Sequence, residues 1–245
     1  MFGFLDKLAK PFVARAYRGG PIDGWPAWAA TLLELKTPNN VALKATESPE
    51  GGSNINIILA LLDETRGLGG DIAECGVFKA ASLSAIGLYL KQTRDPRRAH
   101  GFDSFQGFDN SVEKDVALGG AENSERRVGG FDGTSLPHVR GKLASLGVLD
   151  RVSLHPGYFA ATLETEPERR YSFVHLDCDI YDSYMQTLSY FYPRLDKGGI
   201  VLFDEYDDPP WPGCNLAIDE FLADKPEKPI RISRDNYVKS YIRKS

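Results

Sequence analysis

The chain has 245 residues, of which 42% are hydrophobic, which is enough to form a substantial core. Its formal net charge of −5 at pH 7 gives no broad basic surface, so we expect no nucleic-acid partner. The sequence has no apolar run of about eighteen residues or more, so we expect no transmembrane segment. The three cysteines form no CxxC pair, which argues against a disulfide framework or a zinc site and favours a cytoplasmic location.

Residues 1–50 mix apolar and basic side chains, and Pro11 interrupts their pattern. They lack a continuous apolar segment with a cleavage site, so we expect no secretory signal. We expect short helices that form a packing arm or join copies into a homo-oligomer. A helix lying on a membrane surface is the alternative.

From Ser53 onward, short apolar runs alternate with segments of helical spacing. Ser53 is expected to cap a helix that Gly67 ends. Strands are expected at 71–75, 98–103, 151–155, 172–177 and 199–204. Helices between them are expected near 80–91, 137–146, 158–165 and 181–192. This alternation predicts right-handed crossovers and a mainly parallel sheet with helices on both sides.

A helix near 214–223 precedes two strands, 230–233 and 237–242, which are separated by only three residues. A gap this short permits only an antiparallel hairpin. A mainly parallel seven-stranded sheet closed by an antiparallel last strand is the Rossmann-like α/β topology of class I methyltransferases. We therefore assign residues 51–245 to one such domain and residues 1–50 to an extension.

Residues 107–136 interrupt the regular pattern, with six glycines, mixed charges and little apolar periodicity. Long loops inside compact domains are usually either functional or disordered. We expect a lid over the active site, with plain disorder as the alternative.

The ends of the first two expected strands are candidates for cofactor binding, because ligands of open α/β sheets bind outside the carboxyl ends of the strands. The first strand ends at Glu74, just before Gly76, and the second ends at Asp103. A carboxylate at Asp103 can accept hydrogen bonds from both hydroxyls of a ribose, although it can also merely cap a turn. The first turn lacks G-x-G-x-x-G, which favours an adenosine-containing cofactor other than NAD.

Acidic residues follow two further strands, which are expected to be neighbours in the sheet. Asp177 and Asp179 follow one buried run, and Asp204 and Glu205 follow the other. Clustered carboxylates repel one another unless protons or a cation intervene. Oxygen ligands alone favour Mg²⁺, with Mn²⁺ or Ca²⁺ as alternatives. Separate capping of each following helix would also explain these residues, and His175 on the same strand is expected to be buried.

Several segments together resemble one known family, the macrocin-type (TylF-like) sugar O-methyltransferases. They occur in the same order and at similar spacing over roughly residues 53–222. These segments are 70–77, 103–107, 155–159, 176–183, 192–195, 198–199, 204–206 and 213–214. The resemblance departs from the family at Ala80 and Ala81, where glycines are common, and at Glu205, where aspartate is usual.

The resemblance implies S-adenosylmethionine as the cofactor and a hydroxyl of a small, sugar-like molecule as the acceptor. By position it assigns cofactor binding to Glu74, Gly76, Ser82, Asp103, Ser104, Gly157 and Tyr158. It assigns Mg²⁺ binding to Asp177, Asp204 and Glu205, and the general base to Asp179. The alternatives are a catechol or other vicinal diol as acceptor, a non-catalytic S-adenosylmethionine-binding protein, and a nicotinamide oxidoreductase.

Overall fold

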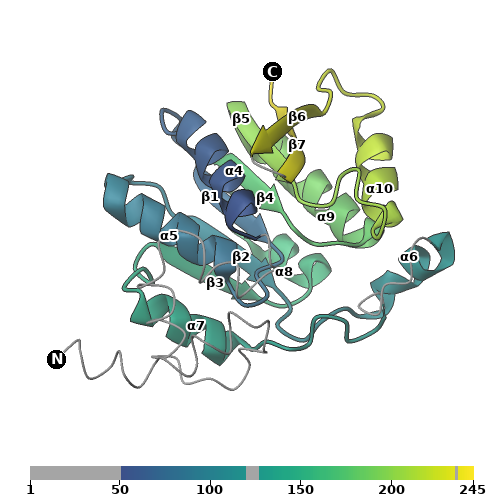
Figure 1. Cartoon of the computed structure of the whole chain (residues 1–245), viewed down its shortest axis with the longest axis horizontal. Coiled ribbons are helices and arrows are strands. Elements are labelled where there is room, and N and C mark those ends of the chain that lie inside the picture. Colours follow the sequence, from purple (N-terminus) through teal and green to yellow (C-terminus); the bar gives the residue numbers. More distant parts are fainter. Residues whose placement is uncertain (1–50, 120–126, 235–236) are drawn as a thin grey trace.

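A seven-stranded sheet forms the centre of the fold (Figure 1). The computed structural model describes residues 51–119, 127–234 and 237–245. In space the strands follow the order β3-β2-β1-β4-β5-β7-β6. Their bounds are β1 (Asp71–Cys75), β2 (Ala99–Asp103), β3 (Val152–Pro156), β4 (Tyr171–Leu176), β5 (Leu195–Phe203), β6 (Ile230–Arg234) and β7 (Tyr237–Arg243). The strands β1 to β5 pair in parallel, and β7 pairs antiparallel with both β5 and β6, which confirms the expected class I topology.

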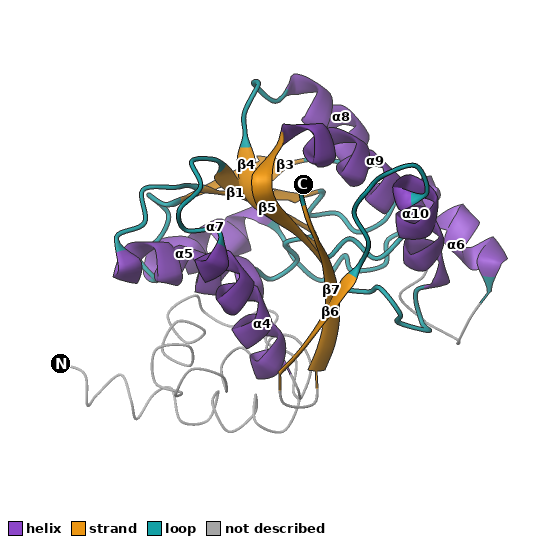
Figure 2. Cartoon of the chain, turned by 90° about the horizontal axis from the view of Figure 1, so that it is seen from above, coloured by secondary structure: helices purple, strands orange, loops and turns teal. Residues whose placement is uncertain are grey.

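Helices cover both sides of the sheet (Figure 2). One side carries α4 (Gly51–Glu64), α5 (Ala81–Thr93) and α7 (Leu136–Ser145). The other side carries α8 (Phe159–Thr165), α9 (Tyr181–Phe191) and α10 (Pro212–Leu222), with the 3-10 turn η2 (Tyr192–Arg194) after α9. The central strands are therefore buried on both faces, and all six residues of β4 are buried.

Two element boundaries differ from expectation. The helix α4 already includes Ser53, so the prediction that Ser53 caps it was wrong. Packing explains the difference, because Ile55, Ile57 and Ile58 of its first turns are at most 2% exposed. The strand β5 begins at Leu195 rather than at residue 199. Its pairing with β4 shifts register between Leu195 and Ile200, and Gly198, with a positive φ, lies in this irregular part of the strand.

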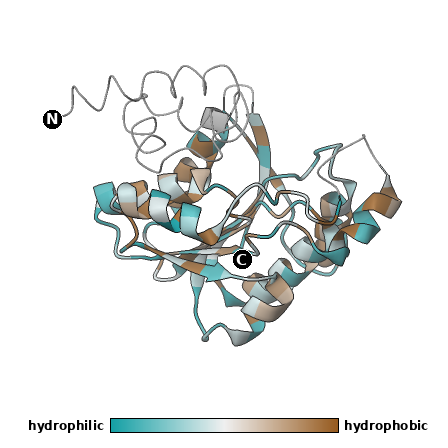
Figure 3. Ribbon diagram, turned by 90° about the horizontal axis from the view of Figure 1, so that it is seen from below, coloured by the Kyte–Doolittle hydropathy of each residue, from teal (hydrophilic) through white to brown (hydrophobic). Residues whose placement is uncertain are grey.

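The segment 107–136 is partly helical where the structure describes it. It contains η1 (Asn110–Val112) and α6 (Glu113–Leu118), and α6 projects from the body, with apolar residues at its outer end (Figure 3). Asp115 attaches this insertion to the body, because its carboxylate accepts a hydrogen bond of 2.9 Å from the Tyr181 backbone N–H. A Cβ at residue 213 would lie 1.7 Å from the Asp115 carboxylate, so Gly213 is needed for this contact.

Two expectations concern parts of the chain outside the described residues. The arm at 1–50, with its proposed role in oligomerisation, lies outside them, as does the middle of the expected lid, 120–126. Within the described ranges, none of the helices has the length and apolar character needed to cross a bilayer.

Arg97 connects three elements at the amino ends of the strands, and we predict that the fold depends on it. Its buried guanidinium pairs with Asp95 at 2.7 Å and donates to Thr65 and to the Ser172 hydroxyl. Arg97→Met leaves the Asp95 charge buried without its partner and should lower the free energy of unfolding by about 3–5 kcal/mol. Urea unfolding would measure this, with the exposed Arg140→Met as a control that changes it by less than about 0.5 kcal/mol.

Glu227 predicts a loss of stability in acid. Burial by itself would raise its pKa, but hydrogen bonds from the backbone N–H and hydroxyl of Ser245 and from the Tyr192 hydroxyl lower the pKa to about 2. Because this lies below the ordinary value of 4.5, the carboxylate stabilises the fold above pH 4.5, and the contribution is lost as the pH falls towards 2.

Glu227→Gln should therefore be less stable than the parent at about pH 6.5, and the difference should shrink at about pH 3. Thermal unfolding of both proteins across this range would measure the effect. A difference that is constant with pH would contradict a role for the ionised carboxylate.

Candidate active site

A cavity of about 360 Å³ lies at the carboxyl ends of the parallel strands, where open α/β sheets bind ligands. Six of the seven residues expected to bind the cofactor line it: Gly76, Ser82, Asp103, Ser104, Gly157 and Tyr158. The expected metal ligands Asp177 and Asp204 and the expected base Asp179 also line it. The seventh cofactor residue, Glu74, and the third metal ligand, Glu205, lie beneath the surface, with 0% and 3% exposure.

The turn after β1 shapes one wall of the cavity. Gly76 has φ of +89°, and a Cβ at this position would lie 1.6 Å from the backbone oxygen of Asp177, so only glycine lets this turn pass so close to β4. Phe78 and Ala80 also adopt left-handed backbone conformations. This conformation favours glycine, which is the common residue at the position of Ala80 in the family that the sequence resembles.

Asp103 supports this turn from the neighbouring strand. Its Oδ2 accepts hydrogen bonds of 2.8 Å from the backbone N–H groups of both Val77 and Phe78. Its Oδ1 accepts a bond of 2.6 Å from the Phe105 backbone N–H. The carboxylate thus caps two turns, as the alternative interpretation of the sequence held, and it also lies on the cavity surface. Ribose binding by Asp103 stays a prediction.

The opposite wall comes from the turns after β2 and β3. The Ser104 hydroxyl donates a 2.9 Å hydrogen bond to the backbone oxygen of Gly107. The Gly157 backbone N–H donates one of 2.9 Å to the backbone oxygen of Asp103, which couples the two turns. Tyr158 is the N-cap residue of α8. Hydrogen bonds to backbone oxygens hold both turns, so they present a fixed surface to a ligand.

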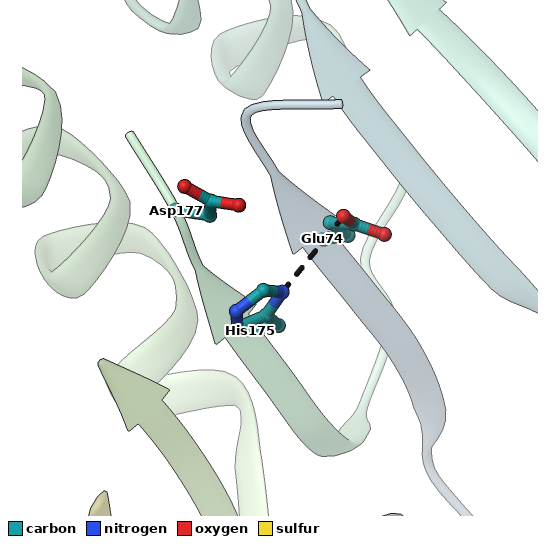
Figure 4. A group of neighbouring side chains, drawn as sticks. All are labelled: Glu74, His175 and Asp177. Atoms are coloured by element: carbon teal, nitrogen blue, oxygen red, sulfur yellow. Dashed lines mark ion pairs between the residues drawn. The ribbon is translucent and has the colours of Figure 1, made fainter. Parts of the chain in front are cut away.

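Beneath the cavity, Glu74 and His175 lie side by side on β1 and β4, with Asp177 above them (Figure 4). The Ser82 hydroxyl donates to Glu74 Oε1, and His175 Nδ1 lies 3.8 Å from the same oxygen. Within the described part of the chain, Glu74 Oε2 has no hydrogen-bond partner. His175 is completely buried, as expected from the sequence, although its contacts have ion-pair rather than hydrogen-bond distances.

The structure brings Asp177, Asp204 and Glu205 together, each offering an oxygen within 4.8 Å of the others. Asp204 is the most heavily contacted. Its Oδ1 accepts a 2.9 Å hydrogen bond from the Asn54 amide, and its Oδ2 lies 2.8 Å from Lys239 Nζ. The Glu205 carboxylate accepts a 2.5 Å bond from the Tyr184 hydroxyl on α9. Three elements besides the strands that carry these acids therefore hold them in place.

The charge around the cavity is strongly negative. The carboxylates that line the cavity or lie beneath it are Glu74, Asp103, Asp109, Asp177, Asp179, Asp204 and Glu205. Lys79 lines the cavity, and the acidic group at its base contacts the cationic side chains of His175 and Lys239. Burial alone favours neutral His175, but its contacts with Asp204 and Glu74 raise its pKa to about 10. Even with these cations charged, the carboxylates are in excess.

This excess changes the proton affinity of the acids. Burial, followed by repulsion from Asp204, raises the pKa of Asp177 to about 7. Burial and the charge of Asp179 raise the pKa of Glu205 well above its ordinary value. Burial would also raise the pKa of Asp204, but the Lys239 ammonium and His175 hold it below its ordinary value. The group as a whole therefore favours binding a proton or a cation.

Asp179 lies near this group but outside the set of three. It has φ of +63°, a left-handed conformation that aspartate tolerates better than most residues. It is half-buried and lines the cavity. Burial and repulsion from Asp177 raise its pKa well above the ordinary value, which suits a carboxylate that accepts a proton.

Several cavity residues were missed in the sequence. Phe108 and Phe131 come from the insertion, where Phe131 makes edge contacts of 5.5 Å between ring centres with both Phe108 and Phe78. Asn54 and Lys239 reach the cavity from α4 and β7. A single amide or lysine in an amphipathic segment carries no sequence signal for a site. Tyr181 and Trp211, two aromatic residues that follow the acidic strand ends in the sequence, do not line the cavity.

Known proteins of one family match this chain. The model of the family described as Macrocin-O-methyltransferase (TylF) matches residues 58–238. Mycinamicin III 3''-O-methyltransferase of Micromonospora griseorubida is 31% identical over 213 residues, covering 86% of this chain and 76% of that protein. Demethyldecarbamoylnovobiocin O-methyltransferase of Streptomyces niveus is 29% identical over 215 residues, covering 86% and 75%.

Solved structures agree with this match. The O-methyltransferase NovP has a TM-score of 0.67 and 27% identity, covering 82% of this chain and 83% of NovP. The calicheamicin methyltransferase CalS11 has the same TM-score at 22% identity, covering 89% and 90%, and shows the shared fold. Because the family match spans most of the chain and the topology agrees with it, the chain belongs to the macrocin-O-methyltransferase (TylF) family and is an O-methyltransferase.

Proposed function

We propose that this enzyme transfers a methyl group from S-adenosylmethionine to a hydroxyl of a sugar-containing small molecule, with Mg²⁺ as a required ion. The observation that carries the proposal is the convergence of Asp177, Asp204 and Glu205 beside a cavity that the Gly76 turn opens. The sugar is supported by a further relative from Streptomyces olivaceus, 29% identical, whose name describes 4'-O-methylation of a tetracenomycin that carries a rhamnosyl group.

The cofactor would lie along the turns after β1, β2 and β3. The Gly76 turn lets a ligand approach the backbone closely, and Ser82 in the first turn of α5 lines the same wall. Ser104, Gly157 and Tyr158 would enclose the nucleoside end. Glu74 would act from beneath, because its unpartnered Oε2 is poised to accept a hydrogen bond.

The acidic group fits a hard divalent cation. Asp177, Asp204 and Glu205 supply oxygen ligands only, as Mg²⁺ prefers, and Mn²⁺ or Ca²⁺ would suit the same set. The excess of carboxylates over cations is what a divalent ion would offset. When bound, such an ion supplies positive charge that lowers the pKa of an acceptor hydroxyl. Lys239 would keep Asp204 oriented, since its ammonium holds Oδ2 from the side of β7.

Asp179 would take the proton from the acceptor hydroxyl. Methyl transfer from a sulfonium is an in-line displacement, so the acceptor oxygen must be aligned with the S–CH₃ bond and deprotonated as it attacks. Asp179 lines the cavity beside the acidic group, so its carboxylate is placed to accept this proton. Phe108 and Phe131 would exclude water from this side, which gives the insertion at 107–136 the role of a lid.

The metal proposal predicts the effect of Asp177→Asn. The amide keeps the shape of the side chain but removes a ligand charge, so Mg²⁺ affinity should fall, and turnover should fall by about 100-fold or more. Calorimetric titration with Mg²⁺ and turnover assays with labelled S-adenosylmethionine and a panel of glycosides and diols would measure both.

The matched control is Asp150→Asn, an exposed carboxylate just before β3 at the opposite end of the strands, which should leave both values unchanged. Excess EDTA should abolish turnover of the parent enzyme. Full activity of Asp177→Asn in EDTA would contradict the metal assignment. Methylation of simple diols with no turnover of any glycoside would replace the sugar with a vicinal diol as the acceptor.

The base proposal predicts a different pattern for Asp179→Asn. This variant should lose about 10²–10⁴-fold in kcat, because the proton acceptor is gone, while its affinities for Mg²⁺ and S-adenosylmethionine stay near those of the parent. Calorimetry together with steady-state kinetics would separate the two effects. A kcat within about threefold of the parent would rule out Asp179 as the base.

A further inference from the structure

A second cavity of about 290 Å³ adjoins the first one. It lies between the loop that follows β5 and the β6–β7 hairpin. Asp204, Tyr237 and Lys239 line both cavities, so the two spaces meet at the edge of the acidic group. A molecule whose reacting hydroxyl lies beside Asp204 could therefore extend into this second space.

The walls of the second cavity are mainly polar. Asp207, Asp208, Arg231 and Ser240 line it, together with Tyr206 and the apolar Val238. A carboxylate can accept hydrogen bonds from two neighbouring hydroxyls, and a guanidinium group can donate hydrogen bonds to two of them. An aromatic ring beside them can pack on the C–H face of a sugar. An apolar aglycone would displace water from these polar groups without offering them hydrogen bonds in its place.

The charges of this cavity argue against a phosphorylated ligand. Arg231 Nη2 lies 3.2 Å from Asp207 Oδ2, and Lys239 Nζ lies 2.8 Å from Asp204 Oδ2, so each cation lining the cavity is already paired with a carboxylate. Asp208 adds a further half-buried carboxylate. A diphosphate would meet a net negative surface and would be repelled.

We infer that the second cavity is a subsite for a second sugar residue, so that the acceptor is a di- or oligosaccharide rather than a nucleotide sugar or the glycoside of an apolar aglycone. This inference rests on the proposed sugar methyltransferase function and adds the class of the group attached to the methylated ring. Arg231 and Asp208 are its specificity-determining residues. Arg231 and its partner Asp207 are both more than half exposed, so hydroxyls of an entering sugar can reach them.

The test compares acceptors that share one terminal sugar and differ in what is attached to it: a methyl glycoside, a disaccharide, an octyl glycoside and a nucleoside-diphosphate sugar. With S-adenosylmethionine and Mg²⁺, kcat/KM for the disaccharide should exceed that for the methyl glycoside by about 10-fold or more, the effect expected of hydrogen bonds to charged groups. The octyl glycoside should gain little, and the nucleoside-diphosphate sugar should be the poorest acceptor.

Arg231→Ala and Asp208→Asn should each reduce the ratio between disaccharide and methyl glycoside towards one. The matched control is Arg234→Ala, an exposed arginine on the same strand that lines neither cavity and should leave the ratio unchanged. Turnover of the methyl glycoside with no gain for the disaccharide, or a ratio that Arg231→Ala does not change, would overturn the subsite while the methyltransferase function stands. Failure to methylate any sugar would reject the proposed acceptor class and the subsite with it.

Discussion

The site depends on one electrostatic constraint, which is that β4 and β5 deliver their terminal carboxylates to the same edge of the sheet. Parallel neighbours make this convergence unavoidable, and burial makes the repulsion costly. Two other elements offset part of this repulsion. Asn54 of α4 donates a hydrogen bond to Asp204 Oδ1, and Lys239 of β7 pairs with Asp204 Oδ2. The negative charge that remains suits a divalent cation. The carboxylates whose repulsion is costly to the fold are therefore also the groups on which the proposed chemistry depends.

Rigidity at the cofactor side comes from backbone contacts rather than from side chains reaching a ligand. Gly76 allows the turn after β1 to lie against β4, and Asp103 holds that turn by accepting two of its backbone N–H groups. Asp103 is therefore an acidic residue that supports this turn and also lies on the cavity surface. A wall fixed in this way can orient a ligand without reorganising when it binds.

The proposed acceptor side is assembled from parts that are far apart in the sequence. The insertion contributes Phe108 and Phe131, while the β6–β7 hairpin contributes Arg231 and Lys239. The first pair is apolar and borders the proposed reaction space, whereas Arg231 borders the adjoining cavity and Lys239 borders both. Selection of the acceptor would therefore depend on the two regions that vary most easily without disturbing the parallel sheet.

The sequence alone determined the sheet, because apolar runs alternating with helical segments permit few topologies, and it determined that Asp177, Asp204 and Glu205 would meet. It could not locate Lys239, since one lysine in an alternating strand looks like any exposed residue. It also could not show that Glu205 lies beneath the cavity surface, bonded to a tyrosine of α9. Such contacts join residues distant in the chain, and only tertiary packing decides which of them meet.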